Sequence, residues 1–427
     1  MKIRNEAHVI YQPRRVALEI LCQVFTNGAY ANIALDKALS EARLSELDRN
    51  FVTAIVYGTI SKKLLLENYL SPFLKKTKAW LHLLLLMTAY QILYMDKIPT
   101  SAAIDEAVKI AKIKGGQDKA NFINAVLRNF SRSPLLAPKD FGTKYSLPDF
   151  LVQKFIAQFG KERAVRIFES LEKPSHVSLR CVDPKLKIPQ TRPSELVDGA
   201  LISDKGNFSN TEAFKKGQIT IQDETSQLVA QILSASPNDQ ILDTCAAPGG
   251  KSCHIASYLE KGKVTAVDIH VHKLKLIQEN ARRLHVEDKI KTLKADAREL
   301  DQYFTAETFD KILVDAPCSG LGLMRRKPDI KYRKNPEDFK ELQELQLEIL
   351  ASSAKLLKKN AIMVYSTCTL ADEENFELVQ LFLKAHSDFE QIEIKHEKLD
   401  IIQDGCIYIS PELYHTDGFF IAKFRKK

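Results

Sequence analysis

The chain has 427 residues, of which 45% are hydrophobic and 27% charged, and its net charge is +8. Its length exceeds what one hydrophobic core usually supports, so we expect two or three domains with the composition of an ordinary soluble protein. The longest apolar run, residues 80–89, is interrupted by His82 and is too short to cross a bilayer, so it predicts a buried helix and not a membrane span.

Residues 1–135 form the first predicted domain, which we expect to be all-α. Within residues 14–25 the apolar side chains Val16, Ile20 and Val24 recur at four-residue intervals, which is typical of an amphipathic helix. The domain has 19 Lys and Arg against 11 Asp and Glu, so it carries the whole positive excess. Two interpretations stay open: a surface that attracts a polyanion such as RNA, or an ordinary solvated helical surface.

Residues 136–220 are predicted to be a small connecting module. A stretch rich in Pro, Lys and Ser, residues 131–144, indicates a linker or domain edge. Two helical patterns and three short strand-like runs follow, and together they predict an α+β arrangement. These patterns lie at residues 150–159, 164–171, 176–181, 201–203 and 218–221.

Residues 221–427 alternate strand-like and helical patterns, which is typical of a doubly wound α/β domain. Strands separated by helices require right-handed crossovers, and these produce a mainly parallel sheet covered on both faces. The last apolar run, residues 419–426, is expected to add an antiparallel edge strand. The predicted fold is therefore multi-domain: an all-α domain, a small α+β module and a Rossmann-like α/β domain.

Two dipeptides, Pro317-Cys318 and Thr367-Cys368, each follow an apolar run that predicts a buried strand. Enzymes with α/β sheets keep their chemistry at such strand ends. Neither cysteine has a second Cys or a His at the spacing of structural zinc sites, so we expect no metal. Seven cysteines in no even framework, and no secretory signal in residues 1–10, favour a reducing cytoplasm over a disulfide. Packing of free thiols remains the alternative.

A glycine-rich turn, residues 242–252, ends one predicted strand and opens a helix. Its small side chains let a ligand approach the backbone near the positive helix start, but it matches neither the dinucleotide nor the triphosphate glycine pattern. The next two strands end at Asp268 and Asp296, which suit the hydroxyls of a ribose and the amino group of an adenine. Adenosine without a phosphate requirement suggests S-adenosylmethionine. For each aspartate taken alone, a helix cap or turn is the competing role.

The sequence from residue 243 onward resembles the bacterial RNA cytosine-5 methyltransferases. The matching motifs are DTCAAPGGKS, AVDIHVHKLKLI, ADAREL, DAPCSGLGLMRRKPDIKY, YSTCT and DGFFIAKF. The front of the chain is similar to the helical RNA-binding domain of the antitermination factor NusB, through RRVALEIL, LDRNFVTAIVYG and KANFINAVLRNF. Ser252, Leu321 and Tyr332 depart from residues frequent in the family. The resemblance implies methylation of carbon 5 of cytosine 967 in 16S rRNA. We also expect the protein to be a monomer.

The resemblance also implies roles for three residues. Cys368 is the nucleophile that attacks carbon 6 of the cytosine, and Cys318 assists removal of the carbon 5 proton and release of the product. Asp315 hydrogen-bonds the cytosine ring, which favours that addition. The implied cofactor is S-adenosylmethionine, and its predicted binding residues are Cys245, Ala246, Ala247, Pro248, Gly249, Gly250, Lys251, Asp268, Asp296 and Asp315.

Three basic residues, Arg325, Arg326 and Lys327, follow the first cysteine motif. They are predicted to bind phosphates beside the target nucleotide, and an exposed basic turn is the alternative. A different kind of function also competes: an RNA-binding ribosome-assembly or antitermination factor with an inactive methyltransferase domain. That reading explains the helical front but gives no reason for both Cys318 and Cys368.

Overall fold

The computed structural model describes residues 13–183, 185–204 and 206–427. The chain divides into two units, Met1–Ala164 with Arg326–Arg333, and Val165–Arg325 with Lys334–Lys427. This division differs from the predicted boundaries, because the helices of the predicted connecting module fall largely in the first unit and its strands in the second. The first twelve residues of the predicted all-α domain lie outside the described residues. Among the described residues, no helix is long and apolar enough to span a membrane.

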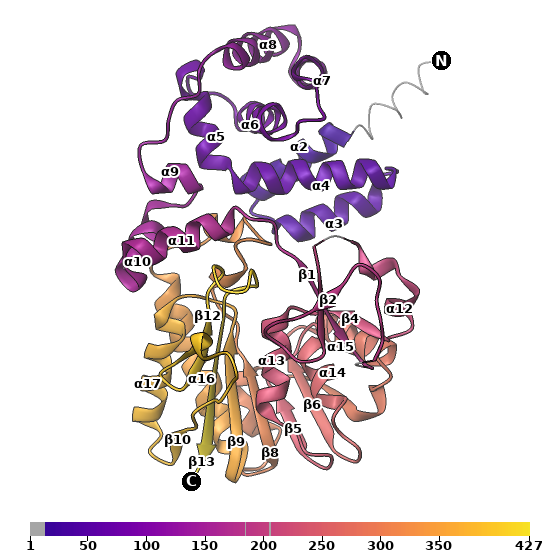
Figure 1. Ribbon diagram of the computed structural model, residues 1–427, viewed down its shortest axis with the longest axis vertical. Helices are drawn as coiled ribbons and strands as arrows, with labels where there is room; N and C mark the ends of the chain where they lie inside the picture. The colour runs from indigo at the N-terminus through magenta and orange to yellow at the C-terminus, as the bar shows by residue number, and fades with distance from the viewer. Residues whose placement is uncertain (1–12, 184, 205) are drawn as a thin grey trace. The chain divides into compact units, whose positions relative to one another are not determined.

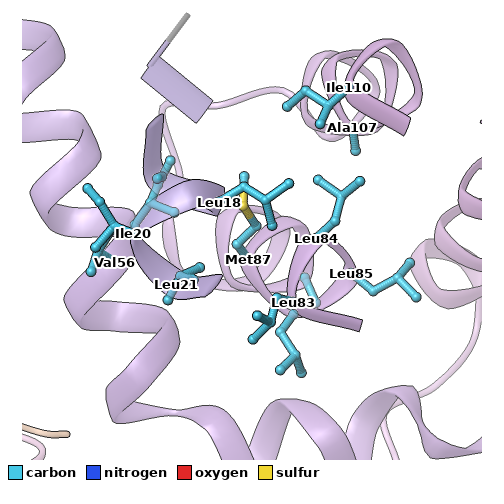
Figure 2. Packing of buried hydrophobic residues seen from close by; sticks show 14 of the residues in the cluster. Leu18, Ile20, Leu21, Val56, Leu83, Leu84, Leu85, Met87, Ala107 and Ile110 are labelled. Carbon is cyan, nitrogen blue, oxygen red and sulfur yellow. The ribbon is translucent and has the colours of Figure 1, made fainter. Parts of the chain in front are cut away.

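The first unit is helical, as predicted (Figure 1). Helix α6 packs at its centre, because its apolar side chains cover every side of the helix and most of them are buried. Side chains of α2, α4, α6 and α7 meet in this core (Figure 2). The helices are α2 (Pro13–Thr26), α3 (Ala31–Glu41), α4 (Glu46–Ser61), α5 (Lys63–Leu70), α6 (Ala79–Tyr94), α7 (Thr100–Gly115), α8 (Gln117–Arg132), α9 (Phe141–Tyr145), α10 (Asp149–Phe159) and α11 (Lys161–Leu171), of which α11 runs on into the second unit.

The segment Arg326–Arg333 packs with the helical unit, although the sequence placed it in the methyltransferase domain. The Asp329 carboxylate accepts a hydrogen bond from Ala31 N, 3.1 Å away, at the start of α3. The buried Lys331 donates its Nζ to Ser61 O, 2.8 Å away, at the end of α4. An anion at a helix start and a cation at a helix end both complement the helix dipole. These contacts explain why eight residues close to Cys318 in sequence belong to the helical unit.

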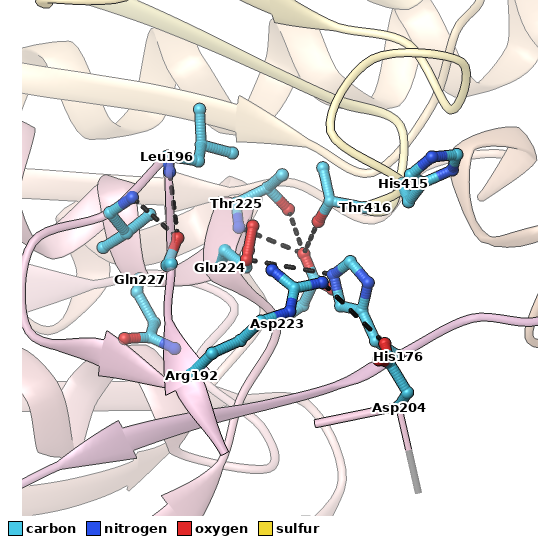
Figure 3. A network of polar contacts seen from close by, with 12 residues as sticks. His176, Arg192, Leu196, Asp204, Asp223, Glu224, Thr225, Gln227, His415 and Thr416 are labelled. Atoms are coloured by element: carbon cyan, nitrogen blue, oxygen red, sulfur yellow. Dashed lines mark hydrogen bonds and ion pairs between the residues drawn. The ribbon is translucent and has the colours of Figure 1, made fainter. Parts of the chain in front are cut away.

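The second unit contains a four-stranded antiparallel sheet in the order β2-β3-β1-β4. Its strands are β1 (Val177–Cys181), β2 (Arg192–Pro193), β3 (Ala200–Ser203) and β4 (Ile219–Ile221), and the short helix α12 (Glu212–Lys215) precedes β4. Beyond β4, Asp223 caps helix α13 (Glu224–Leu233) by accepting from Thr225 N at 3.0 Å, and it also accepts from the Thr416 hydroxyl at 3.0 Å (Figure 3). This carboxylate thereby ties the start of α13 to the loop before the last strand.

The main sheet has nine strands, and its central path is β11-β12-β13-β9-β8-β5-β6-β7, with β10 paired to β13 (Figure 1). The strands β5 to β9 are parallel, and the C-terminal strands add antiparallel pairs. The predicted doubly wound α/β fold is therefore confirmed. The sequence predicted that the last strand would lie at an edge of the sheet, and this prediction is wrong. Strand β13 lies inside the sheet, between β9 and β12. The strands are β5 (Gln240–Asp243), β6 (Lys263–Asp268), β7 (Ile290–Lys294), β8 (Phe309–Asp315), β9 (Leu357–Thr367), β10 (Phe389–Gln391), β11 (Ile402–Gln403), β12 (Cys406–Ile409) and β13 (Phe419–Lys426).

The order of the parallel strands reverses at β5, which pairs with β6 on one side and β8 on the other. Ligands of open α/β sheets bind outside the carboxyl ends of the strands at such a reversal. The turn after β5 and the ends of β6, β8 and β9 meet at this edge. The accompanying helices are α14 (Gly250–Ala256), α15 (Val271–Arg283), α16 (Asp338–Leu356) and α17 (Phe376–Ala385).

Candidate active site

The two predicted cysteines lie together at the carboxyl ends of β8 and β9. These strands are parallel neighbours, and their register pairs Asp315 with Ser366. Cys318 and Cys368 follow the paired strand ends by a few residues, and their Sγ atoms are 3.2 Å apart. The backbone N of Cys368 also lies 3.4 Å from Cys318 Sγ. Strand pairing therefore brings together two thiols that are fifty positions apart in the sequence.

Close backbone contacts join the two cysteine loops. Gly322 N donates to Cys368 O at 3.0 Å, and Gly418 N donates to Gly322 O at 2.9 Å. A Cβ atom at Gly322 would lie 2.0 Å from Gly418 O, which is far inside any real contact. Glycine is therefore required at position 322 for these loops to approach each other.

Two adjacent buried residues, Glu374 and Asn375, form hydrogen bonds with the residues that flank the two cysteines. Glu374 Oε2 accepts from Ser319 N, next to Cys318, at 2.9 Å. Asn375 contacts both sides of Cys368: its Oδ1 accepts from the Thr367 hydroxyl at 2.6 Å, and its Nδ2 donates to Thr369 O at 3.1 Å. The sequence analysis missed this pair, because an acidic residue and an Asn before a helix look like ordinary capping residues.

A buried polar network supports Glu374. Gln346 Nε2 donates to Glu374 Oε2 at 2.9 Å and to Pro317 O at 2.9 Å. The Tyr365 hydroxyl lies 2.7 Å from Glu374 O and 3.1 Å from Gln346 Oε1, and its single proton serves these two acceptors. Buried polar groups with several partners each keep one geometry, so this network makes the loop around Cys318 rigid.

The environment of Cys318 favours its protonated form. Its hydrogen bond with the Cys368 sulfur, its burial, and the negative charges of Cys368 and Glu374 raise the pKa of Cys318 well above its ordinary value. The first of these causes depends directly on the neighbouring thiol. A change in the state of Cys368 must therefore change the acidity of Cys318.

Asp315 and Lys251 form an ion pair beside the cysteines. Lys251 Nζ lies 2.7 Å from Asp315 Oδ2, and the Ser366 hydroxyl donates to Asp315 Oδ1 at 2.8 Å. Lys251 also lies over the Phe419 ring, 5.2 Å from its centroid. Burial opposes the charge of Lys251, but the Asp315 charge and hydrogen bond outweigh burial, and the negative charge of Cys368 adds to them, so the pKa of Lys251 is raised. Lys251 is thus held in place as a cation and is not a freely solvated side chain.

The glycine-rich turn connects β5 to α14. Gly249 has a φ of +100°, which side chains rarely adopt, and a Cβ there would lie 3.0 Å from Ile277 Cα. At Gly250, by contrast, a Cβ would have no neighbour closer than 3.9 Å. The turn therefore leaves open space at the start of α14, where a helix presents unpaired N–H groups to a ligand.

The strand-end aspartates already make local bonds. Asp268 Oδ1 accepts from His270 N at 2.8 Å. Asp296 accepts from Arg298 N at 3.0 Å and forms an ion pair with the Arg298 guanidinium at 2.7 Å. Each of these aspartates therefore fills the turn or cap role that was its alternative, and binding of a cofactor by either one stays a prediction.

The structure separates the three predicted RNA contacts. Arg325 donates to the backbone carbonyls of Pro411 and His415, so its guanidinium holds that loop. Arg326 is partly buried and Lys327 is exposed, and both belong to the segment that packs with the helical unit. Within residues 13–183, 185–204 and 206–427, no cluster of three His, Cys, Asp or Glu side chains is placed to hold a metal ion.

Known protein families and relatives match both parts of this chain. A family model described as 16S rRNA methyltransferase RsmB/F matches residues 230–425, and the NusB family model matches residues 11–132. A Bacillus subtilis (strain 168) protein named "Probable ribosomal RNA small subunit methyltransferase B" is 40% identical over 97% of this chain and 98% of its own length. This chain belongs to the ribosomal RNA small subunit methyltransferase B family.

Solved structures are also similar to this methyltransferase B family member. The crystal structure of PH0851 superposes with a TM-score of 0.83, at 24% identity over 97% of this chain and 99% of its own, and shows the same fold. A methyltransferase homologue from Pyrococcus horikoshii has a TM-score of 0.58 and 27% identity, covering 68% of this chain and all of its own. The NusB match confirms the predicted domain type at the front of the chain.

Proposed function

We propose that this family member transfers a methyl group from S-adenosylmethionine to carbon 5 of a cytosine in 16S rRNA, cytosine 967 by resemblance. The observation that carries the proposal is the pair of thiols at Cys318 and Cys368, 3.2 Å apart beside the Lys251–Asp315 ion pair. A methyltransferase whose target atom is already nucleophilic does not require cysteines to activate that atom. Carbon 5 of cytosine is a poor nucleophile and requires covalent activation, which one thiol can provide.

Cys368 is assigned the attack on carbon 6. The addition forms a bond between Cys368 Sγ and carbon 6 and moves an electron pair toward carbon 5, which makes carbon 5 nucleophilic. That electron pair would then take the methyl group of a bound sulfonium cofactor, which would leave as a neutral thioether. Lys251 lies close enough for the negative charge of Cys368 to help raise the pKa of Lys251, so a cation stands beside the attacking sulfur. Asp315, which has lone pairs beyond those used by Lys251 and Ser366, is assigned the contact with the cytosine edge, where it accepts a hydrogen bond from the exocyclic amino group beside the ring nitrogen.

Cys318 is assigned the removal of the carbon 5 proton. While Cys368 is free, its hydrogen bond and charge keep the pKa of Cys318 raised. Once Cys368 is bonded to carbon 6, both influences disappear, and Cys318 gives up its proton more readily. It can then take the proton from carbon 5 as the bond between Cys368 and carbon 6 breaks, and the coupling of the two thiols supports this assignment.

S-adenosylmethionine supplies the methyl group when it is bound. The turn fits an adenosine ligand for two reasons. Gly249 adopts the positive φ that the turn requires, and the space that a Cβ of Gly250 would occupy is open. Asp268 at the end of β6 is assigned to the ribose, Asp296 to the adenine, and the remaining residues from Cys245 to Lys251 to the turn that surrounds the cofactor.

The test is a methylation assay on 16S rRNA with bisulfite sequencing of the product. Cys368→Ala should abolish transfer and adduct formation, and Cys318→Ala should accumulate a covalent protein–RNA adduct that survives denaturing electrophoresis. Cys22→Ser, in the helical unit, is the control and should behave as the unmodified protein does. Transfer by Cys368→Ala would remove it as the nucleophile. An adduct formed by the Cys368 variant instead would reverse the two roles.

A further inference from the structure

The second unit has a cavity that is separate from the cysteine pair. Its volume is about 350 Å³, and it lies among β1, α13, α14, the residues just before β3 and those just after β1 and α14. No residue that lines it belongs to the predicted catalytic, cofactor or RNA-binding sets. The lining side chains that matter below are Arg180, Gln227, His254, Ser257, Tyr258 and the exposed Asp198.

Arg180 is a buried cation, and no acidic side chain among the described residues pairs with it. Its side chain is 5% exposed. Its Nε donates to the neutral amide oxygen of Gln222 at 3.0 Å, and its Nη2 makes no hydrogen bond within the described part of the chain. Burial lowers the pKa of Arg180, and the charged neighbours that act on it are cysteines, Tyr258 and a second guanidinium, Arg283. None of these is a carboxylate.

His254, which also lines the cavity, has a second unpaired nitrogen, and this atom is buried. The ring is 6% exposed, and its Nε2 lies 2.8 Å from the Tyr258 hydroxyl. Its Nδ1 makes no hydrogen bond within the described residues. Burial and the Arg180 charge lower the pKa of His254 to about 3, so the ring is neutral at physiological pH. When the Tyr258 hydroxyl donates to Nε2, the proton of the neutral ring is on Nδ1, which becomes a donor.

A buried charge is costly unless an opposite charge and hydrogen bonds compensate it. The protein supplies Arg180 with an amide oxygen but no anion, and the cavity beside it has room for one. Guanidinium and imidazole N–H groups together suit the oxygens of a phosphate, which accepts several charge-assisted hydrogen bonds at once. Asp198, an exposed acidic residue, also lines the cavity, and its charge opposes an anion there.

We propose that this cavity is an oxoanion site that binds a phosphate group, with Arg180 and His254 as its donors. The phosphate has two possible sources: a phosphodiester of the RNA that the enzyme binds, or free phosphate. Only the first source rests on the proposed function. In that case the site fixes the RNA backbone at a point away from the cysteines.

The first experiment is a thermal unfolding titration of the full chain with inorganic phosphate, with chloride at matched ionic strength. The melting temperature should rise with phosphate for the unmodified protein and for Arg282→Met, an exposed arginine on α15. The rise should be absent in Arg180→Met and reduced in His254→Gln. Without phosphate, Arg180→Met should melt no lower than the unmodified protein, because it removes an uncompensated charge.

The second experiment measures binding of single-stranded RNA as salt is varied. If the site holds RNA phosphate, Arg180→Met should reduce the slope of log affinity against log salt by about one contact, while Arg282→Met leaves it unchanged. A lost phosphate response with an unchanged slope assigns the site to free phosphate. If phosphate stabilises neither the unmodified protein nor Arg282→Met, and the RNA slope is unchanged in Arg180→Met, the proposal is wrong. Neither measurement requires methyl transfer. A protein that fails to methylate RNA could therefore still show phosphate stabilisation, so failure of the proposed function is distinguishable from failure of this proposal.

Discussion

Glu374 offers the sharpest test of how the active site is held. Replacing it with alanine leaves Ser319 N and one N–H of the Gln346 amide without their acceptor in a buried place. An unsatisfied buried donor costs roughly 1–3 kcal/mol, so two cost about 2–6 kcal/mol. Burial raises the pKa of Glu374, which shows that the carboxylate is itself unfavourably placed. Its removal therefore offsets part of that loss, and we expect a net loss of about 2–3 kcal/mol.

The effect on catalysis should exceed the effect on stability. Ser319 is next to Cys318, and a displacement of about 1 Å in a reacting group can lower a rate about 100-fold. We therefore expect Glu374→Ala to lower kcat about 100-fold with little change in the KM for the methyl donor. Glu374→Gln keeps one acceptor oxygen. Its unfolding free energy and its kcat should therefore lie between those of the unmodified protein and those of Glu374→Ala.

The assays are urea unfolding and initial rates of methyl transfer to 16S rRNA. Glu377→Ala, an exposed glutamate on the next helix, is the matched control and should match the unmodified protein. Unchanged kcat and unchanged unfolding free energy in Glu374→Ala would refute the positioning argument. If the alanine variant does not fold, the glutamine variant still decides the question through its kcat.

Three further predictions concern packing and buried charge. Gly322→Ala should abolish methyl transfer and lower the unfolding free energy by about 1–3 kcal/mol, because its Cβ overlaps Gly418 O; a fully active variant would contradict this. Burial raises the pKa of Asp243 from 3.8 to about 7, so the folded state binds this proton more tightly and stability should fall as pH rises from about 4 to 7; Asp243→Asn should remove that fall in pH-dependent unfolding. Burial and the charge of Lys62 lower the pKa of Lys331 from 10.5 to about 7, so the unfolded state binds this proton more tightly. Stability should therefore rise between those values, and an equal rise in Lys331→Met would contradict the assignment.

Local sequence patterns predicted most of the elements. The apolar periodicity of residues 14–25 and the apolar run at residues 80–89 correspond to the buried helices α2 and α6. The alternation after residue 221 correctly indicated a doubly wound sheet. Strand and helix patterns repeat over short distances, so a single sequence records them directly. The position of β13 inside the sheet was not predicted, because it depends on β12 and β10, whose short runs carry little signal.

Motifs at strand ends, together with the family resemblance, predicted the chemical groups of the candidate site: Cys318, Cys368, Asp315 and Lys251. Only the tertiary structure decided their geometry, since the 3.2 Å between the two sulfur atoms follows from the pairing of β8 with β9. It also decided that Glu374 and Asn375 hold both cysteine loops, that Arg325 binds backbone carbonyls, and that Arg326–Arg333 pack with the helices. Each of these contacts joins segments that the linear sequence keeps apart, and a pattern of neighbouring residues contains no record of them.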